Sequence, residues 1–181
     1  MMPNWAWGTV ETTGTMDAVL AFSKRFIADD DDKKTGDVKF FARSFFNDSR
    51  GNVENNIRQS FKDVAAGEEK QHDFYIDFAW SAHGCIIDGY PQDFEECITL
   101  PEACALDGVD VNITTQEPGM CFEEAISCTR DGELSCESKE LQPVRCKSCG
   151  YTESIASFDA LEDMVCSECG SCDFERIEEG S

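Results

Sequence analysis

Two copies of a Cys-x-x-Cys-Gly motif near the end of the chain constrain its fold more than any other feature. Sixteen residues lie between Cys149 and Cys166, a spacing typical of sites in which four cysteines hold one zinc ion. The glycine after each motif permits the positive φ angle that so tight a turn needs. Four thiolates complete a tetrahedron and leave no position for water, which favours a structural role. The sequence therefore predicts a zinc ribbon over residues 144–177, with one structural Zn²⁺ held by Cys146, Cys149, Cys166 and Cys169.

The remaining cysteines do not show metal-ligand spacing. The chain has 11 cysteines, an odd number, and its first residues lack the basic and apolar regions of an export signal. Both observations favour reduced thiols and the cytoplasm of the host cell. Cys172 is an alternative to Cys169 as a ligand, with a less suitable spacing. The other cysteines are expected to be small buried hydrophobic residues: Cys85, Cys97, Cys104, Cys121, Cys128 and Cys136.

Hydrophobic periodicity predicts a separate domain over residues 1–141, followed by the ribbon domain at 142–181. A Trp-, Thr- and Val-rich segment that ends at Gly14 predicts a strand at 5–13, and alternation predicts strands at 74–80 and 109–114. The Asp131-Gly132 turn predicts a hairpin of 120–128 with 133–141. Helical spacing predicts helices at 16–27, 52–64 and 94–105, while residues 38–46 fit either a strand or a short helix. This order predicts an α+β fold, a ferredoxin-like α/β sandwich with an antiparallel sheet.

Short motifs of residues 2–140 resemble a known family. Met2-Pro3-Asn4-Trp5 precedes a strand that ends at Gly14, and Ala79-Trp80-Ser81, residues 117–122 (EPGMCF) and Asp131-Gly132-Glu133 follow in order. In this order they are similar to the YubB ferredoxin-like domain family of phages and plasmids. Ala6 stands where members of that family usually have cysteine. The resemblance implies a mobile-element gene and supplies no catalytic residues.

The net charge of −22 is concentrated in the middle of the chain, where no Lys or Arg lies between Lys70 and Arg130. A surface with this charge repels phosphate and attracts basic grooves, although solubility alone is an equally economical interpretation. The acids expected to contact a partner are Asp88, Asp93, Glu95, Glu96, Asp107, Asp110, Glu123 and Glu124.

The chain shows no recognisable catalytic site. His83 lies near Cys85, but catalytic pairs usually converge from distant segments. No glycine-rich phosphate loop is present, and no apolar run is long enough to cross a membrane. We therefore expect a protein that is not an enzyme, with no small-molecule substrate and no membrane contact.

These features favour a phage or plasmid protein that inhibits a host defence protein. The expected partner has a basic nucleic-acid-binding groove, as a CRISPR nuclease such as Cas9 or a restriction nuclease does, so the protein would be an anti-CRISPR or anti-restriction inhibitor. The alternative is a nucleic-acid-associated zinc-ribbon factor. Residues 39–46 (KFFARSFF) interleave bases with aromatics, as nucleic-acid platforms do, although core-facing phenylalanines explain the same pattern.

Overall fold

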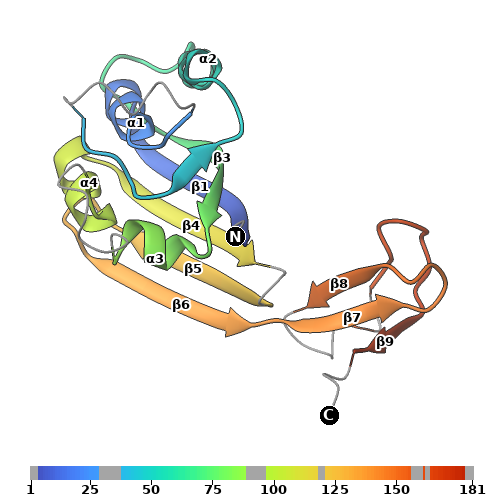
Figure 1. Cartoon of the computed structure of the whole chain (residues 1–181). Coiled ribbons are helices and arrows are strands. Elements are labelled where there is room, and N and C mark those ends of the chain that lie inside the picture. The colour runs from blue at the N-terminus through green and yellow to red at the C-terminus, as the bar shows by residue number, and fades with distance from the viewer. Residues whose placement is uncertain are drawn as a thin grey trace.

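The computed structural model describes residues 4–28, 38–88, 97–117, 121–155, 161 and 164–177. The described chain is mixed α/β, with a six-stranded sheet and a three-stranded sheet (Figure 1). The strands are β1 (Trp5–Thr15), β2 (Ser44–Phe46), β3 (Glu69–Ala79), β4 (Asp110–Glu117), β5 (Phe122–Cys128), β6 (Leu134–Glu140), β7 (Gln142–Cys146), β8 (Thr152–Ile155) and β9 (Phe174–Arg176). The helices are α1 (Met16–Ser23), α2 (Arg50–Ser60), α3 (Ala82–Ile86) and α4 (Leu100–Asp107).

The first strand lies in the interior of the large sheet. The strand order is β2-β3-β1-β4-β5-β6, and each neighbouring pair is antiparallel. β1 and β4 approach most closely at Gly8, where an added Cβ would lie 2.0 Å from the carbonyl oxygen of Thr114. A side chain at this position would therefore push the two strands apart.

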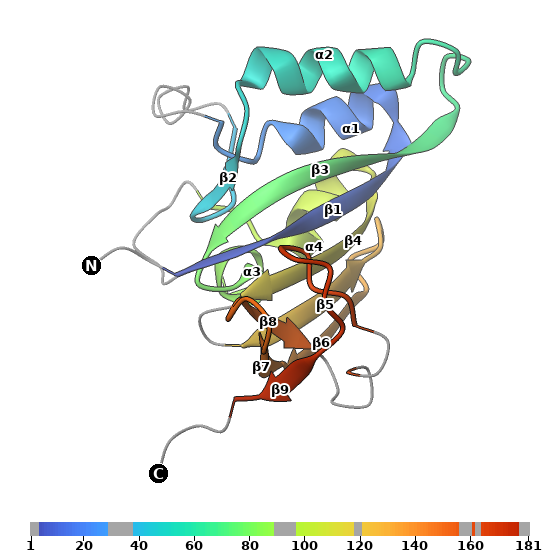
Figure 2. The same cartoon turned by 90° about the vertical axis from the view of Figure 1, so that its right-hand side faces the viewer.

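The helices cover one face of the large sheet, and the three-stranded sheet lies on the side of the other face, as the two views together show (Figure 2). Side chains alternate between the two faces along each strand. In β3, Phe74, Ile76 and Phe78 point to the helices and are buried, whereas Tyr75 is exposed on the opposite side. We call the side that carries Trp5, Trp7, Tyr75 and Asp77 the outer face.

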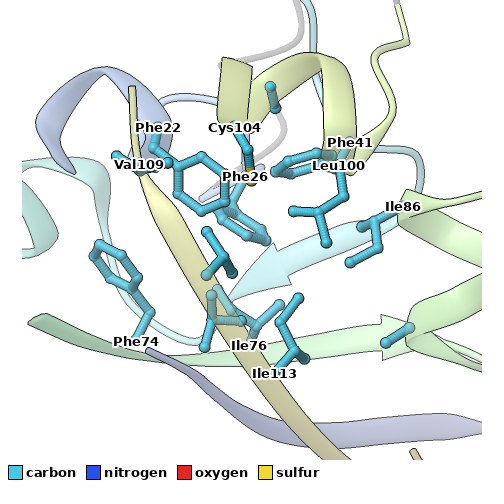
Figure 3. Packing of buried hydrophobic residues seen from close by; sticks show 14 of the residues in the cluster. Phe22, Phe26, Phe41, Phe74, Ile76, Ile86, Leu100, Cys104, Val109 and Ile113 are labelled. Atoms are coloured by element: carbon cyan, nitrogen blue, oxygen red, sulfur yellow. The ribbon is translucent and has the colours of Figure 1, made fainter. Parts of the chain in front are cut away.

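Phenylalanine side chains fill the core between the sheet and the helices (Figure 3). Phe26 is fully buried and packs against Phe22 and Phe41, with ring centroids 5.6 and 4.9 Å apart. Leu100 and Cys104 of α4 belong to the same buried cluster as these phenylalanines. Offset and edge-on aromatic contacts of this kind add to the free energy gained by burial.

Local chemistry explains where two of the helices begin and end. Thr15 accepts a hydrogen bond from the amide of Ala18 at the start of α1. In α4, Pro101 occupies the first turn, Glu102 accepts a hydrogen bond from the amide of Thr99, and Gly108 ends the helix with φ 71°. These are the residue types that favour helix termini.

Several segments differ from the sequence prediction, among them the helix expected at 52–64, which lies at Arg50–Ser60. The helix expected at 16–27 ends at Ser23, because the chain turns after that residue. The amide of Ile27 then donates a hydrogen bond to the carbonyl of Ser44, the first residue of β2. The helix expected at 94–105 lies at Leu100–Asp107, and residues 94–96 lie outside the described part. α3 was not predicted, since five residues are too few to show a helical period.

The predicted hairpin is confirmed. β5 and β6 pair antiparallel from Phe122↔Glu140 to Cys128↔Leu134. Every residue of β6 is exposed, which is expected of an edge strand that the helices do not cover. Leu141 then separates the large sheet from the three-stranded sheet, whose order is β8-β7-β9.

Among the helices that the structure describes, none combines the length and the apolar character needed to cross a membrane.

Candidate metal centre and the carboxylates of the large sheet

The four cysteines predicted to bind zinc form one cluster at the three-stranded sheet. The sulfur atoms of Cys146, Cys149, Cys166 and Cys169 all lie within 4.8 Å of one another. The Cys146–Cys169 and Cys149–Cys166 sulfur pairs are each 3.6 Å apart. Zinc–sulfur bonds of about 2.3 Å in a tetrahedron place the sulfurs about 3.8 Å apart. The cluster therefore has the size of a four-thiolate zinc site.

The two turns that carry these cysteines have the same hydrogen-bond pattern. The amide of Gly150 donates to the carbonyl of Cys146, and the amide of Gly170 donates to that of Cys166, each at 2.8 Å. Both glycines have positive φ, at 80° and 71°. The matching geometry follows from the matching Cys-x-x-Cys-Gly sequences, because a residue with a Cβ is strained at such φ values.

Backbone amides prepare one sulfur for ionisation. Burial opposes the thiolate of Cys146, but hydrogen bonds from the amides of Cys149 and Ser148 outweigh it and lower its pKa to about 6. For Cys169, the amide of Ser171 favours the thiolate, but hydrogen bonds with the neighbouring thiols and burial raise its pKa to about 12. A zinc ion held by these four cysteines would displace the remaining protons, because only the thiolate is a ligand.

The other cysteines have different surroundings. Cys172 is exposed, and it is not part of the cluster of four. Cys85, Cys104 and Cys128 are buried, as expected for small hydrophobic residues, and Cys136 is exposed on the edge strand. Cys97 and Cys121 are intermediate.

The structure does not pair His83 with Cys85. Burial raises the pKa of the Cys85 thiol to about 12, and its sulfur donates to the carbonyl of Ala79 at 3.2 Å. Nδ1 of His83 lies 3.3 Å from a carboxylate oxygen of Asp88. Cys85 is therefore a protonated core residue in this structure.

Two of the acids expected at a partner surface are buried instead. Asp107 forms a two-point ion pair with Arg25, and the side chains are 6% and 6% exposed. Glu124 accepts hydrogen bonds from the amide of Ala82 at 2.7 Å and from the hydroxyl of Thr115 at 3.3 Å. These two carboxylates stabilise the fold and do not contribute to an exposed surface.

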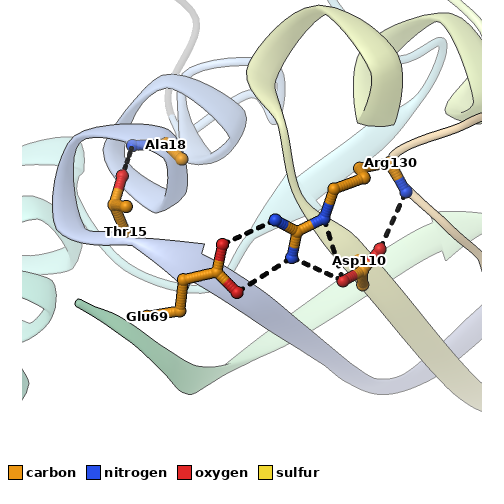
Figure 4. A network of polar contacts seen from close by, with 5 residues as sticks. All are labelled: Thr15, Ala18, Glu69, Asp110 and Arg130. Atoms are coloured by element: carbon orange, nitrogen blue, oxygen red, sulfur yellow. Dashed lines mark hydrogen bonds and ion pairs between the residues drawn. The ribbon is translucent and has the colours of Figure 1, made fainter. Parts of the chain in front are cut away.

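Asp110 lies in a polar network at one end of the outer face. Arg130 binds both Asp110 and Glu69, with nitrogen–oxygen distances of 2.5–3.1 Å (Figure 4). The hydrogen bonds from Arg130 hold the pKa of both carboxyls below their usual values. Their charge is thus balanced in part within the protein.

Among the remaining expected acids, Asp88 is exposed and Glu123 is half-buried on the outer face, where it accepts a hydrogen bond from Gln116 at 3.1 Å. Asp93, Glu95 and Glu96 lie outside the described residues. The eight expected acids thus do not form a single described patch.

Sequence reasoning missed the outer face as a surface. Trp7 is 53% exposed and Tyr75 is 75% exposed, although aromatic side chains of this size are usually buried. Trp5 is also exposed and packs edge-on against Phe45, with centroids 5.7 Å apart. The signal was the alternation in β1, where Trp5 and Trp7 fall on the side opposite the buried Ala6.

Comparison of the chain with protein-family models, with curated proteins and with solved structures gives no match. The cysteine cluster and the outer face are therefore the features that carry functional information.

Proposed function

We propose that the protein is a non-enzymatic accessory protein of a phage or plasmid that binds a basic nucleic-acid-handling protein of the host. In this proposal the outer face occupies the nucleic-acid-binding groove of a CRISPR or restriction nuclease and competes with its DNA or RNA. Supporting evidence for a mobile-element origin is the resemblance of residues 2–140 to the YubB domain family.

One observation carries the proposal. The outward positions of β3, β1, β4 and β5, all of which are described, hold six carboxylates and no Lys or Arg, although Arg130 pairs with Glu69 and Asp110 at one end and Lys139 of β6 lies opposite Glu123. Such a surface attracts a cationic groove and repels a phosphate backbone. Within this face, the carboxylates are Glu11, Glu69, Asp73, Asp77, Asp110 and Glu123.

We further infer that the first four strands form a ferredoxin-like unit. Their order, β2-β3-β1-β4, is antiparallel throughout, and helices connect β1 to β2 and β3 to β4. This order is the one that two split βαβ units produce. The β5–β6 hairpin extends the sheet, and a zinc ion bound by the four cysteines would stabilise the small second sheet.

The alternative function is direct binding of single-stranded nucleic acid. The exposed Trp5, Trp7 and Tyr75 favour it, because RNA-binding sheets stack bases on exposed aromatic side chains. The carboxylates between them oppose it, since they repel the phosphates that such an interface must approach.

The decisive experiment measures competition. A labelled DNA–nuclease complex, with Cas9 as the first candidate, is titrated with the protein and followed by electrophoretic mobility. We expect displacement of the DNA, and weaker displacement as salt rises, because screening shortens the range of charge attraction to about 8 Å at physiological ionic strength. The protein alone should leave duplex DNA unshifted.

The control compares two sets of neutralising substitutions with equal charge change. Glu11→Gln, Asp73→Asn, Asp77→Asn and Glu123→Gln together alter the outer face. Asp63→Asn, Glu68→Gln, Asp131→Asn and Glu133→Gln together alter exposed loops. Loss of binding in the first set alone supports the proposal. Equal loss in both sets, or tight binding of labelled DNA by the protein alone, contradicts it.

A further inference from the structure

We propose that Asp77 and the aromatic side chains around it form a binding site for an arginine side chain of the protein partner. This inference rests on the proposed function and names the chemical group that the outer face recognises. The aromatic side chains are Phe45, Trp7 and Tyr75.

The strand register places these side chains around one carboxylate. Phe45 of β2 and Trp7 of β1 lie directly opposite Asp77, one on each side. Tyr75 lies two residues away on the same strand and therefore on the same face. Side chains directly opposite each other on antiparallel strands have their Cβ atoms about 4.5–5.5 Å apart. The register thus places aromatic residues at three positions around Asp77.

The carboxylate of Asp77, like that of Glu11, differs from the carboxylates of Asp73 and Glu123 on the same face. Asp73 accepts a hydrogen bond from Gln71 at 3.0 Å, and Glu123 accepts one from Gln116. Among the described residues, Asp77 makes no hydrogen bond or ion pair that would balance its charge. It is also half-buried, so part of its hydration is already lost to the neighbouring rings.

A guanidinium group fits this arrangement better than other cations. It is planar, it binds a carboxylate through two parallel hydrogen bonds, and it stacks on aromatic faces. An ammonium group is compact and strongly hydrated, and it gains less from flanking rings. Phosphate and nucleic acid are disfavoured by the carboxylate itself. The occupant we infer is therefore an arginine on a basic protein surface.

The exposed area supports a protein as the source of this arginine. Trp7 and Tyr75 expose more than half of their surfaces, and Trp5 exposes 42%. Exposed aromatic groups next to one another mark interaction sites, and aromatic–arginine contacts are enriched in the energetically dominant parts of protein interfaces.

The test uses the full-length zinc-loaded protein and short acetylated peptides. The peptides are identical except for one central position, which is arginine, lysine or citrulline. Tryptophan fluorescence and amide NMR shifts report binding at β1 and β3. Citrulline keeps the shape of arginine and removes its charge. We expect the arginine peptide to bind about five to ten times more tightly than the lysine peptide, and we expect the citrulline peptide to show no saturable binding.

Two matched variants locate the site. Asp77→Asn should lower the affinity for the arginine peptide about tenfold, which corresponds to about 1.4 kcal/mol. Asp63→Asn removes the same charge from an exposed position outside the outer face and should change the affinity less than twofold. Trp7→Ala should reduce the preference for the arginine peptide over the lysine peptide, because the indole ring of Trp7 would stack on the guanidinium group.

Three results would overturn the inference: equal effects of Asp77→Asn and Asp63→Asn, equal binding of the arginine and citrulline peptides, or tighter binding of single-stranded RNA than of the arginine peptide. The proposed function is judged separately by competition with nuclease-bound DNA. An Asp77→Asn protein that still displaces the DNA at wild-type concentration would leave the proposed function intact and eliminate the arginine site.

Discussion

Arg25 and Asp107 form a buried ion pair across 82 residues of sequence. Nε and one terminal nitrogen of Arg25 donate to the two carboxylate oxygens of Asp107 at 2.5 and 2.7 Å. The other terminal nitrogen donates to the carbonyl of Lys39 at 3.2 Å. The pair therefore ties the end of α1 to the end of α4 and to the segment that leads to β2.

Removal of one partner of this pair should strongly destabilise the protein. Arg25→Met leaves a buried carboxylate without its counter-ion, and Asp107→Leu leaves a buried guanidinium, so each should lower the free energy of unfolding by about 3–5 kcal/mol. The double variant should recover much of the loss, since neither charge remains. Urea unfolding measures all three. Asp88→Asn, a change at an exposed position, should have little effect on the free energy of unfolding. A double variant that loses as much free energy of unfolding as the two single variants together would contradict the pairing.

Glu123 and Glu124 are adjacent acids that point to opposite faces of β5, so they should respond differently to the same substitution. Glu124→Ala leaves the buried amide of Ala82 and the hydroxyl of Thr115 without their acceptor, and should lower the free energy of unfolding by about 1–3 kcal/mol. Glu123→Ala should change it by less than about 0.5 kcal/mol. Thermal or urea unfolding of the two variants measures the difference, and equal losses would contradict the assigned directions.

We expect one zinc ion per chain. Elemental analysis of the purified protein should give one zinc ion per chain. The Cys149→Ser variant should bind no zinc, because a structural site needs all four ligands. Cys172→Ser is the matched control, since Cys172 is exposed outside the cluster, and it should keep its zinc. NMR should show loss of order in β7–β9 and an intact large sheet in Cys149→Ser. Zinc bound by Cys149→Ser as in the wild type would contradict the ligand assignment.

Acid should weaken the polar network around Arg130. The folded-state pKa values of Glu69 and Asp110 are lowered, chiefly by hydrogen bonds from Arg130. The stabilisation is therefore fully present when the pH lies above the pKa values of these carboxyls in the unfolded chain, which are about 4. It is lost as the pH falls through their lower pKa values in the folded protein.

The variant Arg130→Gln should show a smaller change in unfolding free energy between pH 6 and pH 3 than the wild type. Urea unfolding at a series of pH values measures this slope. The control is Arg58→Gln, which removes an exposed arginine whose terminal nitrogen lies 3.9 Å from a carboxylate oxygen of Glu54. This variant should have the same pH slope as the wild type. Identical slopes for wild type and Arg130→Gln would mean that the network does not set the pKa values.

The sequence predicted features that depend on local patterns. The alternation of Phe74, Ile76 and Phe78 marked the buried side of β3, and the repeated Cys-x-x-Cys-Gly spacing marked the cluster that the structure confirms. Zinc as the bound metal remains a prediction. The β5–β6 hairpin followed from alternation and from its turn residues.

The roles of individual acids could not be predicted in this way. Asp107 and Glu124 bind partners 82 and 42 residues away in the sequence, and charge alone does not reveal which acid is buried. The outer face depends on the register of β2, β3 and β1, because only that pairing brings Phe45, Asp77 and Trp7 into one row. Register is set by the whole sheet and is invisible within any one strand.

The interior position of β1 has a consequence for synthesis on the ribosome. β1 emerges before the other strands of the large sheet, and β3 and β4 each add to one of its edges. β5 then adds to β4, and β6 adds to β5, so nearly every strand finds its neighbour already made; β2 waits for β3. The cysteine cluster closes after the large sheet, because Cys166 and Cys169 follow all six strands of that sheet in the sequence. The sheet can therefore assemble outward in the direction of translation, as N-terminal units generally do, before the metal site exists.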